Sequence, residues 1–170
     1  MNRRGFVGAI SALSLVTLLP SGALALTDAQ AKALVDSAVA DINKVITSGK
    51  SLSSMIKEFE RIFVKYGDVP IIARSALGVD ARRASKSQLK AYTKAFQGYI
   101  ARKYGRRFEE FVGGRIEVEA ARKVKSFHEV HTTAFLRGEA PFAVDFLVSD
   151  KSGRARFFDM IIEGISLRIS

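Results

Sequence analysis

The N-terminal two thirds of the chain repeat apolar side chains every three or four residues, which is the period of an amphipathic α-helix. Two capping-box patterns, Thr27 with Gln30 and Ser85 with Gln88, mark where the first and the longest of these helices begin. Glycines interrupt the pattern between segments. It predicts five helical segments, at residues 28–47, 52–65, 69–77, 86–104 and 106–111.

After Gly114 the apolar period changes from about 3.6 residues to 2, which is typical of β-strands. The polar stretch Ser149–Gly153 separates the last two strands and is a hairpin turn, because Asp, Ser and Gly accept turn dihedrals. The fold class is therefore α+β, with N-terminal helices packed on one face of a C-terminal four-stranded antiparallel sheet. The four strands are expected at residues 115–121, 127–137, 142–148 and 154–163.

The last hairpin is apolar on both faces. Alternation places Phe142, Val144, Phe146 and Val148 on one face of the third strand, and the fourth strand is expected to add Phe158, Met160 and Ile162 to that face. A sheet with so little polar surface must be covered or must line a cavity. The longest helix carries a matching apolar stripe, which we expect to face the hairpin: Tyr92, Phe96, Tyr99 and Ile100. Periodicity alone leaves open whether this interface is a filled core or a cavity.

The amino terminus has the organisation of an export signal. Arg3 and Arg4 precede an apolar stretch at 6–19, and Ala23-Leu24-Ala25 fits a cleavage site. Residues 1–25 are thus predicted to be a signal peptide, and residues 26–170 a single domain. Both the general secretory route and the twin-arginine route fit the two arginines.

Composition limits the partners. The chain has no cysteine, which excludes disulfides and thiolate-bound metals. Removal of the signal leaves 25 basic and 17 acidic residues, a balance that favours anionic partners such as phosphate headgroups. Among anionic partners, nucleic acid is the least favoured, because the protein is predicted to be exported. Three basic runs bracket the longest helix and the first strand, where they could contact headgroups or docking partners: Arg82-Arg83 with Lys86, Arg102-Lys103 with Arg106-Arg107, and Arg122-Lys123 with Lys125.

One polar cluster could carry chemistry. A turn centred on Ser152 would place Asp145 opposite Asp159, and His131 could join them as part of a general-base site. The more common outcome is that such an aspartate binds backbone or an arginine and stabilises the sheet. His128 and His131 point to opposite faces of a strand, so they cannot hold one metal ion. We therefore expect neither a catalytic set nor a metal site, with an Asp145/Asp159/His131 enzyme or a filled-core adaptor as the alternative functions.

Three stretches resemble the MlaC family of periplasmic phospholipid carriers, also called toluene-tolerance proteins. They are FFDMIIEGISL near the C-terminus, APFAVDFLV on the preceding strand, and ARSALGVDARRASKSQLKAYTKAFQGYIARKYG over residues 73–105. Together they cover residues 73–167 in the order and spacing of the family. The chain departs from the family after EGISL, where members continue into further helices that help to wall the pocket; the short form could suit a different lipid, for example a hopanoid-type one.

The resemblance implies a periplasmic carrier, without enzymatic activity or cofactor, that shuttles phospholipid between the two membranes. Its partners would be an outer-membrane lipoprotein and an inner-membrane ABC transporter with an MCE subunit. Acyl tails would lie in a cavity between helices and sheet, with the headgroup outside. The residues expected to contact the tails are Tyr92, Phe96, Tyr99, Ile100, Phe142, Val144, Phe146, Phe158, Met160 and Ile162.

Overall fold

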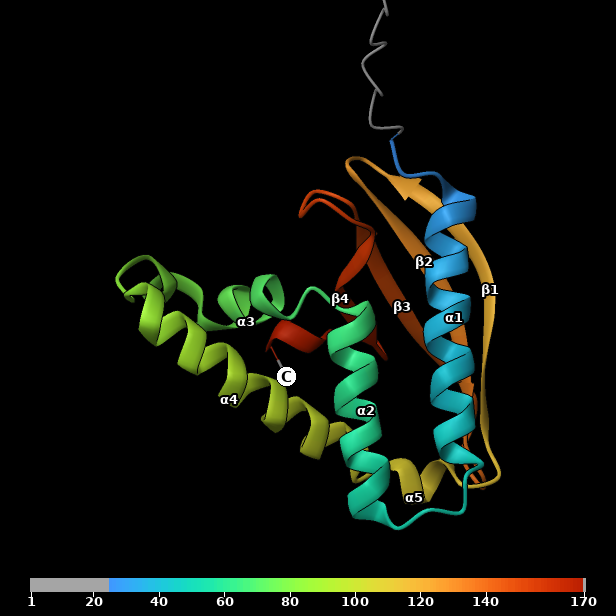
Figure 1. Cartoon of the computed structure of the whole chain (residues 1–170). Coiled ribbons are helices and arrows are strands. Elements are labelled where there is room, and N and C mark those ends of the chain that lie inside the picture. Colours follow the sequence, from blue (N-terminus) through green and yellow to red (C-terminus); the bar gives the residue numbers. More distant parts are fainter. Residues whose placement is uncertain (1–24, 170) are drawn as a thin grey trace, which may run out of the picture.

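The computed structural model describes residues 25–169, except for the side chains of residues 108 and 109 (Figure 1). All five predicted helical segments are present. Both predicted capping boxes form, with Thr27 and Ser85 as N-caps. The predicted signal peptide, apart from Ala25, lies outside the described residues. The helices are α1 (Asp28–Ile46), α2 (Leu52–Tyr66), α3 (Val69–Leu77), α4 (Lys86–Gly105) and α5 (Phe108–Phe111), with short 3₁₀ helices η1 (Gly78–Arg82) and η2 (Leu167–Ile169).

The sheet is antiparallel throughout, and its strands lie in the order of the chain. The four predicted strands form its body, and a two-residue strand follows at the edge of β4. The α+β fold and the meander are thus confirmed, with one short strand more than predicted. The strands are β1 (Arg115–Val124), β2 (Phe127–Phe135), β3 (Phe142–Ser149), β4 (Arg156–Ile162) and β5 (Ile165–Ser166).

Helix α1 lies along the inner face of the curved sheet, mainly against β1 and β2 (Figure 1). Asn43 fastens it there, because its amide donates to the Ile116 carbonyl at 3.0 Å and accepts from the Ile116 N–H at 3.1 Å. At its other end, Asp28 pairs with the buried His128 at 2.6 Å. Side chains at the two ends of α1 thus set its position on the sheet, and the apolar stripe between them forms the core with Val130 and Val148.

Helix α4 does not lie across the sheet, contrary to the expected facing of its apolar stripe against the last hairpin. It packs on α2 and α3, and α3 and α4 together project from the body (Figure 1). Ile100 is fully buried in the common core, whereas Tyr99 is 46% exposed. Of the predicted stripe, Phe96 and Ile100 are buried, Tyr92 is half-buried and Tyr99 is exposed, and the helix packs against other helices and not against the sheet.

Two β-bulges shift the expected alternation of the strands. In β1 the register changes between Val118 and Ala121, so Ala121 packs against the core, where strict alternation after Ile116 and Val118 would place Ala120. Between β3 and β4 the register changes after Leu147, which pairs with Asp159, whereas Val148 pairs with Phe157. A bulge sets two residues against one. The expectation that Phe158 shares the inner face with Met160 is therefore wrong: Phe157 is buried there at 3% exposure.

The edge of β4 is covered near both of its ends. Near its start the Asp68 N–H donates to the Phe157 carbonyl at 2.7 Å, and further on β5 pairs with Ile161 and Ile162. Gly67 approaches so closely that a Cβ there would lie 2.8 Å from the Phe157 ring. Within residues 25–169 no helix has the length and hydropathy needed to cross a membrane.

Candidate functional site

An apolar cavity lies between the inner face of the sheet and the helices. Its volume is about 80 Å³, and its surface is almost wholly carbon. Helices α1, α2, α4 and α5 form one wall and strands β1 to β4 the other. Its lining residues are Ile42, Phe59, Tyr104, Arg107, Phe111, Ile116, Ala134, Phe142, Val144, Phe146, Met160 and Ile162.

The half-buried lining residues mark the mouth of the cavity, at the end where α4 leads into α5. Phe142 and Ile162 are only partly covered here, in contrast to Phe146, which is 2% exposed. Among the described side chains, Arg107 is the one charged lining residue, and its Nε donates to Glu110 at 2.9 Å. This hydrogen bond raises the pKa of Arg107 above its ordinary value. The mouth therefore combines the Arg107–Glu110 ion pair with an apolar interior.

Five of the ten predicted lipid-contacting residues line this cavity, and all five come from the last hairpin: Phe142, Val144, Phe146, Met160 and Ile162. They assemble because alternate residues of neighbouring antiparallel strands share a face. Whether they touch a lipid stays a prediction, but the structure brings them together around one void.

The other five lie elsewhere. Tyr92, Phe96 and Tyr99 border a hollow on the surface between α4 and the C-terminal η2. Ile100 is fully buried in the helical core. Phe158 packs edge-on against Phe127, with the ring centroids 5.5 Å apart, on the outer face of the sheet. The four residues of α4 lie away from the cavity because that helix packs on other helices and not on the sheet. Phe158 lies away from it because the bulge turns its side chain to the outer face.

Sequence reasoning missed the wall formed by the helices. Ile42 and Phe59 lie in apolar stripes that the sequence shows plainly, but no local signal says that α1 and α2, and not α4, face the sheet. Arg107 belongs to one of the three basic runs expected near a pocket, and it is the only member of those runs that lines this cavity. The basic run at the end of α4 was therefore a sequence signal that could have located the mouth of the cavity.

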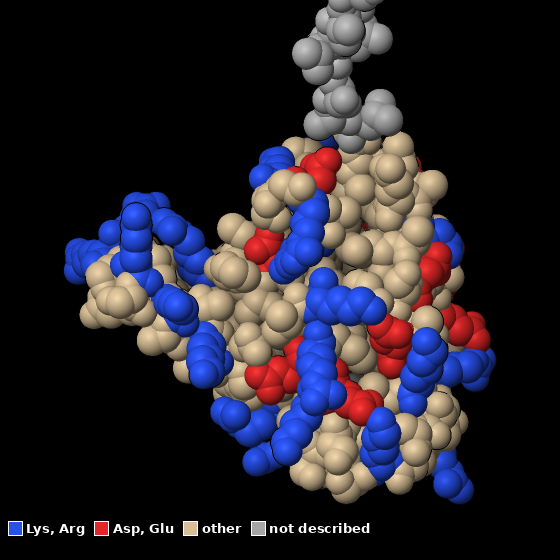
Figure 2. Space-filling view, viewed as in Figure 1, with Lys and Arg blue, Asp and Glu red and all other residues tan. Residues whose placement is uncertain are grey.

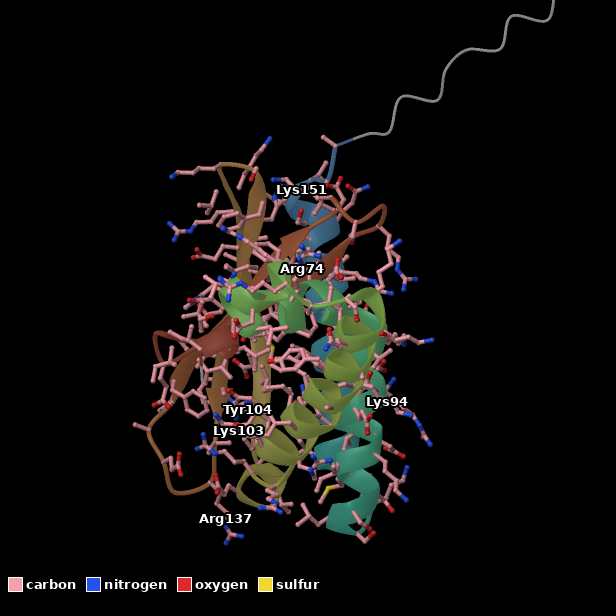
Figure 3. All side chains as sticks on the ribbon, turned by 90° about the vertical axis from the view of Figure 1, so that its left-hand side faces the viewer. Arg74, Lys94, Lys103, Tyr104, Arg137 and Lys151 are labelled. Carbon is pink, nitrogen blue, oxygen red and sulfur yellow. The ribbon has the colours of Figure 1, made fainter. Side chains whose placement is uncertain are left out.

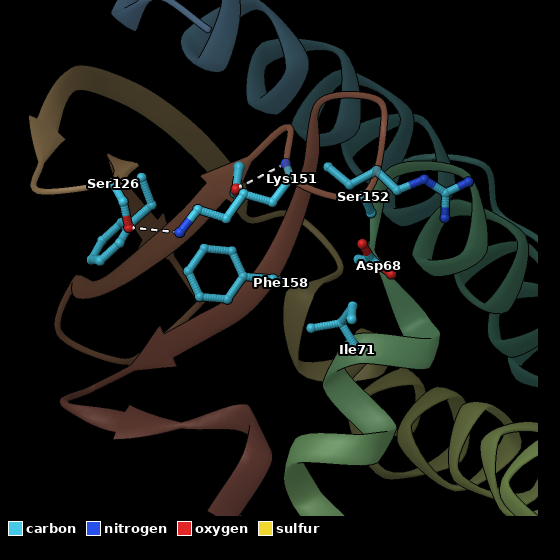
Figure 4. Close-up of a pocket in the computed structure, with 9 residues that line it drawn as sticks. Asp68, Ile71, Ser126, Lys151, Ser152 and Phe158 are labelled. Atoms are coloured by element: carbon cyan, nitrogen blue, oxygen red, sulfur yellow. Dashed lines mark hydrogen bonds between the residues drawn. The ribbon is translucent and has the colours of Figure 1, made fainter. Parts of the chain in front are cut away.

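A second pocket, of about 400 Å³, lies on the outer face beside the tip of the last hairpin (Figure 4). Phe127, Phe158 and Ile71 form its apolar part. Lys151 crosses it and donates to the Ser126 hydroxyl at 2.9 Å. Arg156 also lines it, and the buried Nε of that side chain finds no hydrogen-bond partner among the described residues. Its mixed charges and hydroxyls make this pocket a poorer match to an acyl tail than the apolar cavity.

The proposed polar cluster does not assemble. Asp145 pairs in register with Ile161, so it does not face Asp159 across the strands as expected. His131 does pair with Asp145, and their side chains are hydrogen-bonded. Asp159 is fully buried and instead accepts hydrogen bonds from Arg168, Ser166 and its neighbour's backbone. None of Asp145, Asp159 and His131 lines either pocket.

The His131–Asp145 pair predicts a small pH dependence of stability. The hydrogen bond to Asp145, with the carboxylates of Glu119 and Glu129 nearby, raises the pKa of His131 above 6.5. A raised folded-state pKa means that the stabilisation is complete below about pH 6.5 and is lost as the pH rises through the folded-state pKa. Because the imidazole is 43% exposed, the effect is expected to stay below about 1 kcal/mol.

Urea unfolding of the wild type and of His131→Gln measures this effect. The free energy of unfolding is expected to differ between the two proteins at about pH 5.5 and to converge by about pH 9. A difference that grows toward alkaline pH would contradict the assignment.

Comparison with known proteins agrees with this architecture. The model of the MlaC protein family matches residues 32–170. Among solved structures, the chain is similar to a phospholipid-binding protein from Ralstonia solanacearum solved in complex with a phospholipid, with a TM-score of 0.71. The two are 21% identical, over 81% of this chain and 80% of that chain. No curated protein matches the chain. Since the family model spans most of the sequence, the chain belongs to the MlaC protein family.

Proposed function

We propose that the protein is a periplasmic phospholipid carrier that holds an acyl tail in the apolar cavity and leaves the headgroup at the mouth. The observation that supports this most directly is the cavity itself, with an apolar surface over nearly all of its area and Arg107 as the single charged residue among the described side chains of its lining. A phosphate headgroup beside that guanidinium would form a charge-assisted hydrogen bond. Family membership and the lipid-bound structure of the similar Ralstonia solanacearum protein point the same way.

The physical reason for a carrier is the cost of an acyl chain in water. Each exposed CH₂ group costs about 0.8 kcal/mol, so a single sixteen-carbon tail costs on the order of 10 kcal/mol. A protein can offset that cost during transit only by offering an equally long dry slot. Release then requires an acceptor that buries the tail as well as the carrier does.

The cavity has to widen before it can hold such a tail. Its present volume of about 80 Å³ is well below the roughly 300–1,000 Å³ that sites for drug-sized ligands occupy. The wall most easily displaced is α5, which is four residues long and joins β1 through Gly113 in a left-handed conformation. We infer that outward movement of this segment, which carries Phe111, lengthens the slot when lipid enters.

The carrier role includes partners on both membranes. Membership in the family supports exchange with an outer-membrane lipoprotein and with an inner-membrane ABC transporter that has an MCE subunit. It also supports a binding function over an enzymatic one, as does the separation of Asp159 from the His131–Asp145 pair. The predicted export signal at 1–25 would deliver the chain to the periplasm.

Native mass spectrometry of the protein purified from its own periplasm tests the proposal. We expect a population heavier than the polypeptide by the mass of one phospholipid, identified after solvent extraction. The control is the same protein after delipidation and refolding, which should gain the adduct again from phospholipid vesicles. Protein that is folded yet consistently free of lipid in both preparations would overturn the carrier function.

A further inference from the structure

The net charge of the protein is concentrated on one projecting part of the fold. We call residues 69–106, which form α3, η1 and α4, the basic arm. The arm contains nine lysines and arginines and one acidic residue, Asp80, whereas residues 26–68 and 107–170 together contain 16 basic and 16 acidic residues. The whole positive excess after the predicted signal peptide therefore belongs to the arm, and the rest of the chain is balanced. The nine basic residues are Arg74, Arg82, Arg83, Lys86, Lys90, Lys94, Arg102, Lys103 and Arg106.

These charges are exposed and uncompensated. All nine side chains belong to exposed residues, and none forms an ion pair with another described residue. Elsewhere basic side chains commonly have a carboxylate partner, as Lys65 has Asp41 and Arg122 has Glu129. Figure 2 shows the difference: blue groups crowd the projecting arm, and red and blue mix on the body. Such uncompensated charge creates a strong positive potential over one surface.

The arm also carries apolar features that fit an interface. Val79, in η1 at its tip, is 75% exposed and is followed closely by Arg82 and Arg83. Between α3 and α4 runs an open groove whose lining includes the apolar side chains of Ile71 and Leu89. The groove is edged by three basic side chains, Arg74, Lys90 and Lys94. Figure 3 looks onto this side of the molecule, where Arg74 and Lys94 are labelled on the two helices.

We propose that the basic arm docks on the surface of an anionic phospholipid bilayer, with Val79 entering the headgroup region. Five of the nine cations are spread along α4, a 20-residue helix about 30 Å in length, and this extent suits an extended planar surface. Basic faces with an apolar part are typical of segments that lie in the membrane interface. An acidic protein is the other partner that such charges could meet, and the experiments below distinguish it from a membrane.

Docking along the whole arm would bring the membrane close to the cavity mouth. Tyr104 lies in the last turn of α4 and lines the cavity, and Arg107 follows one turn later. The arm would thus orient the mouth toward the lipid surface. The docking itself does not depend on the cavity holding lipid, so the two proposals can fail separately.

Vesicle flotation tests the docking. Delipidated protein is expected to float with vesicles that contain phosphatidylglycerol and to stay behind with pure phosphatidylcholine. Replacing Arg82, Arg83 and Lys86 together with Gln is expected to weaken binding roughly a hundredfold, because each cation near an anionic surface contributes about fivefold to the affinity. Raising the salt from about 0.1 M to about 1 M shortens the screening length from about 10 Å to about 3 Å and should release the wild type.

A matched control separates position from total charge. Lys123, Lys125 and Arg154 are also exposed and lie outside the arm, and their triple replacement with Gln lowers the net charge by the same amount. It is expected to change binding less than threefold. Equal losses in the two variants would show that only net charge matters and would overturn the arm assignment. Absence of vesicle binding by the wild type would overturn the membrane proposal and favour an acidic protein partner.

Entry of the tip can be followed by fluorescence, because the chain contains no tryptophan. The emission of Val79→Trp is expected to shift to the blue on addition of phosphatidylglycerol vesicles. Val64 is 40% exposed on α2, so Val64→Trp provides the control and should not shift. Lipid loading is read separately, by native mass spectrometry of the same variants. If the emission of Val79→Trp does not shift in vesicle-bound protein, Val79 does not enter the headgroup region.

Discussion

Replacing Asp159 with Ala is expected to lower the free energy of unfolding by about 3 kcal/mol or more. Removing one partner of a buried ion pair costs about 3–5 kcal/mol, because the other charged group stays buried without its partner. Asp159 is fully buried, and its carboxylate accepts from Arg168 Nε at 2.8 Å, Ser166 Oγ at 2.7 Å and the Met160 N–H at 2.9 Å. Arg168 is one-third exposed, which places the expected cost near the lower end of the range.

The same carboxylate holds the C-terminal segment in place. Arg168 also donates to Ser75 on α3 at 3.0 Å, so the pair joins β4, η2 and α3. Without Asp159 the segment after Glu163 should become accessible to protease before the rest of the protein. Urea unfolding and limited proteolysis measure the two effects.

Asp145 provides the matched control for Asp159. It lies on the neighbouring strand, but its partner His131 is half-exposed, so Asp145→Ala is expected to cost less than about 1 kcal/mol. Comparable losses for the two aspartates would contradict the difference in burial that the structure shows. A stable Asp159→Ala with an intact C-terminal segment would contradict the bridging role.

Filling the cavity is expected to abolish lipid loading while the protein stays folded. Ala134 is fully buried on β2 and lines the void, so Ala134→Leu places three more carbon atoms into it. Excluding three methylene groups of a tail would lose about 2.4 kcal/mol of burial, or roughly fiftyfold in affinity. Because the added carbons occupy space that is already empty, the melting temperature should be unchanged or slightly higher. Native mass spectrometry and thermal unfolding read the two effects.

The control for Ala134→Leu is the same substitution on the other face of the sheet. Ala143 lies on β3 opposite Thr133, with its side chain away from the cavity. Ala143→Leu should therefore load lipid like the wild type. If both variants lose lipid, the loss comes from a general disturbance of the sheet and not from filling the cavity. If Ala134→Leu still loads fully, the tail occupies another part of the molecule, for which the hollow beside Tyr92 and Phe96 is the next candidate.

Local patterns along the chain were sufficient for most of the architecture. Helix starts depend on side chains within three residues, which is why the caps at Thr27 and Ser85 could be read directly. The turn at 149–153 and the alternation of β3 likewise depend on near neighbours. Five cavity residues followed from the alternation along β3 and β4. The family resemblance also needed no structure, since it rests on motifs in the order of the chain.

Contacts between distant segments decided the rest. A bulge changes the face of every following residue, and nothing in the run Phe157-Phe158-Asp159 says which residue is the extra one. The choice of α1 as the helix on the sheet depends on Asn43 meeting Ile116 and on Asp28 meeting His128. These partners lie 73 and 100 residues apart, beyond the reach of any periodic pattern.

The sequence by itself determined the helices, the strands, the antiparallel meander and the family. It also contained the uneven distribution of charge, although only the fold shows that residues 69–106 project as one arm. The tertiary structure alone decided which apolar side chains surround a void and which fill the core. The physical reason is that hydrophobicity predicts that a residue is buried but does not predict which residues surround it. A cavity exists only where the surfaces of particular elements fail to meet.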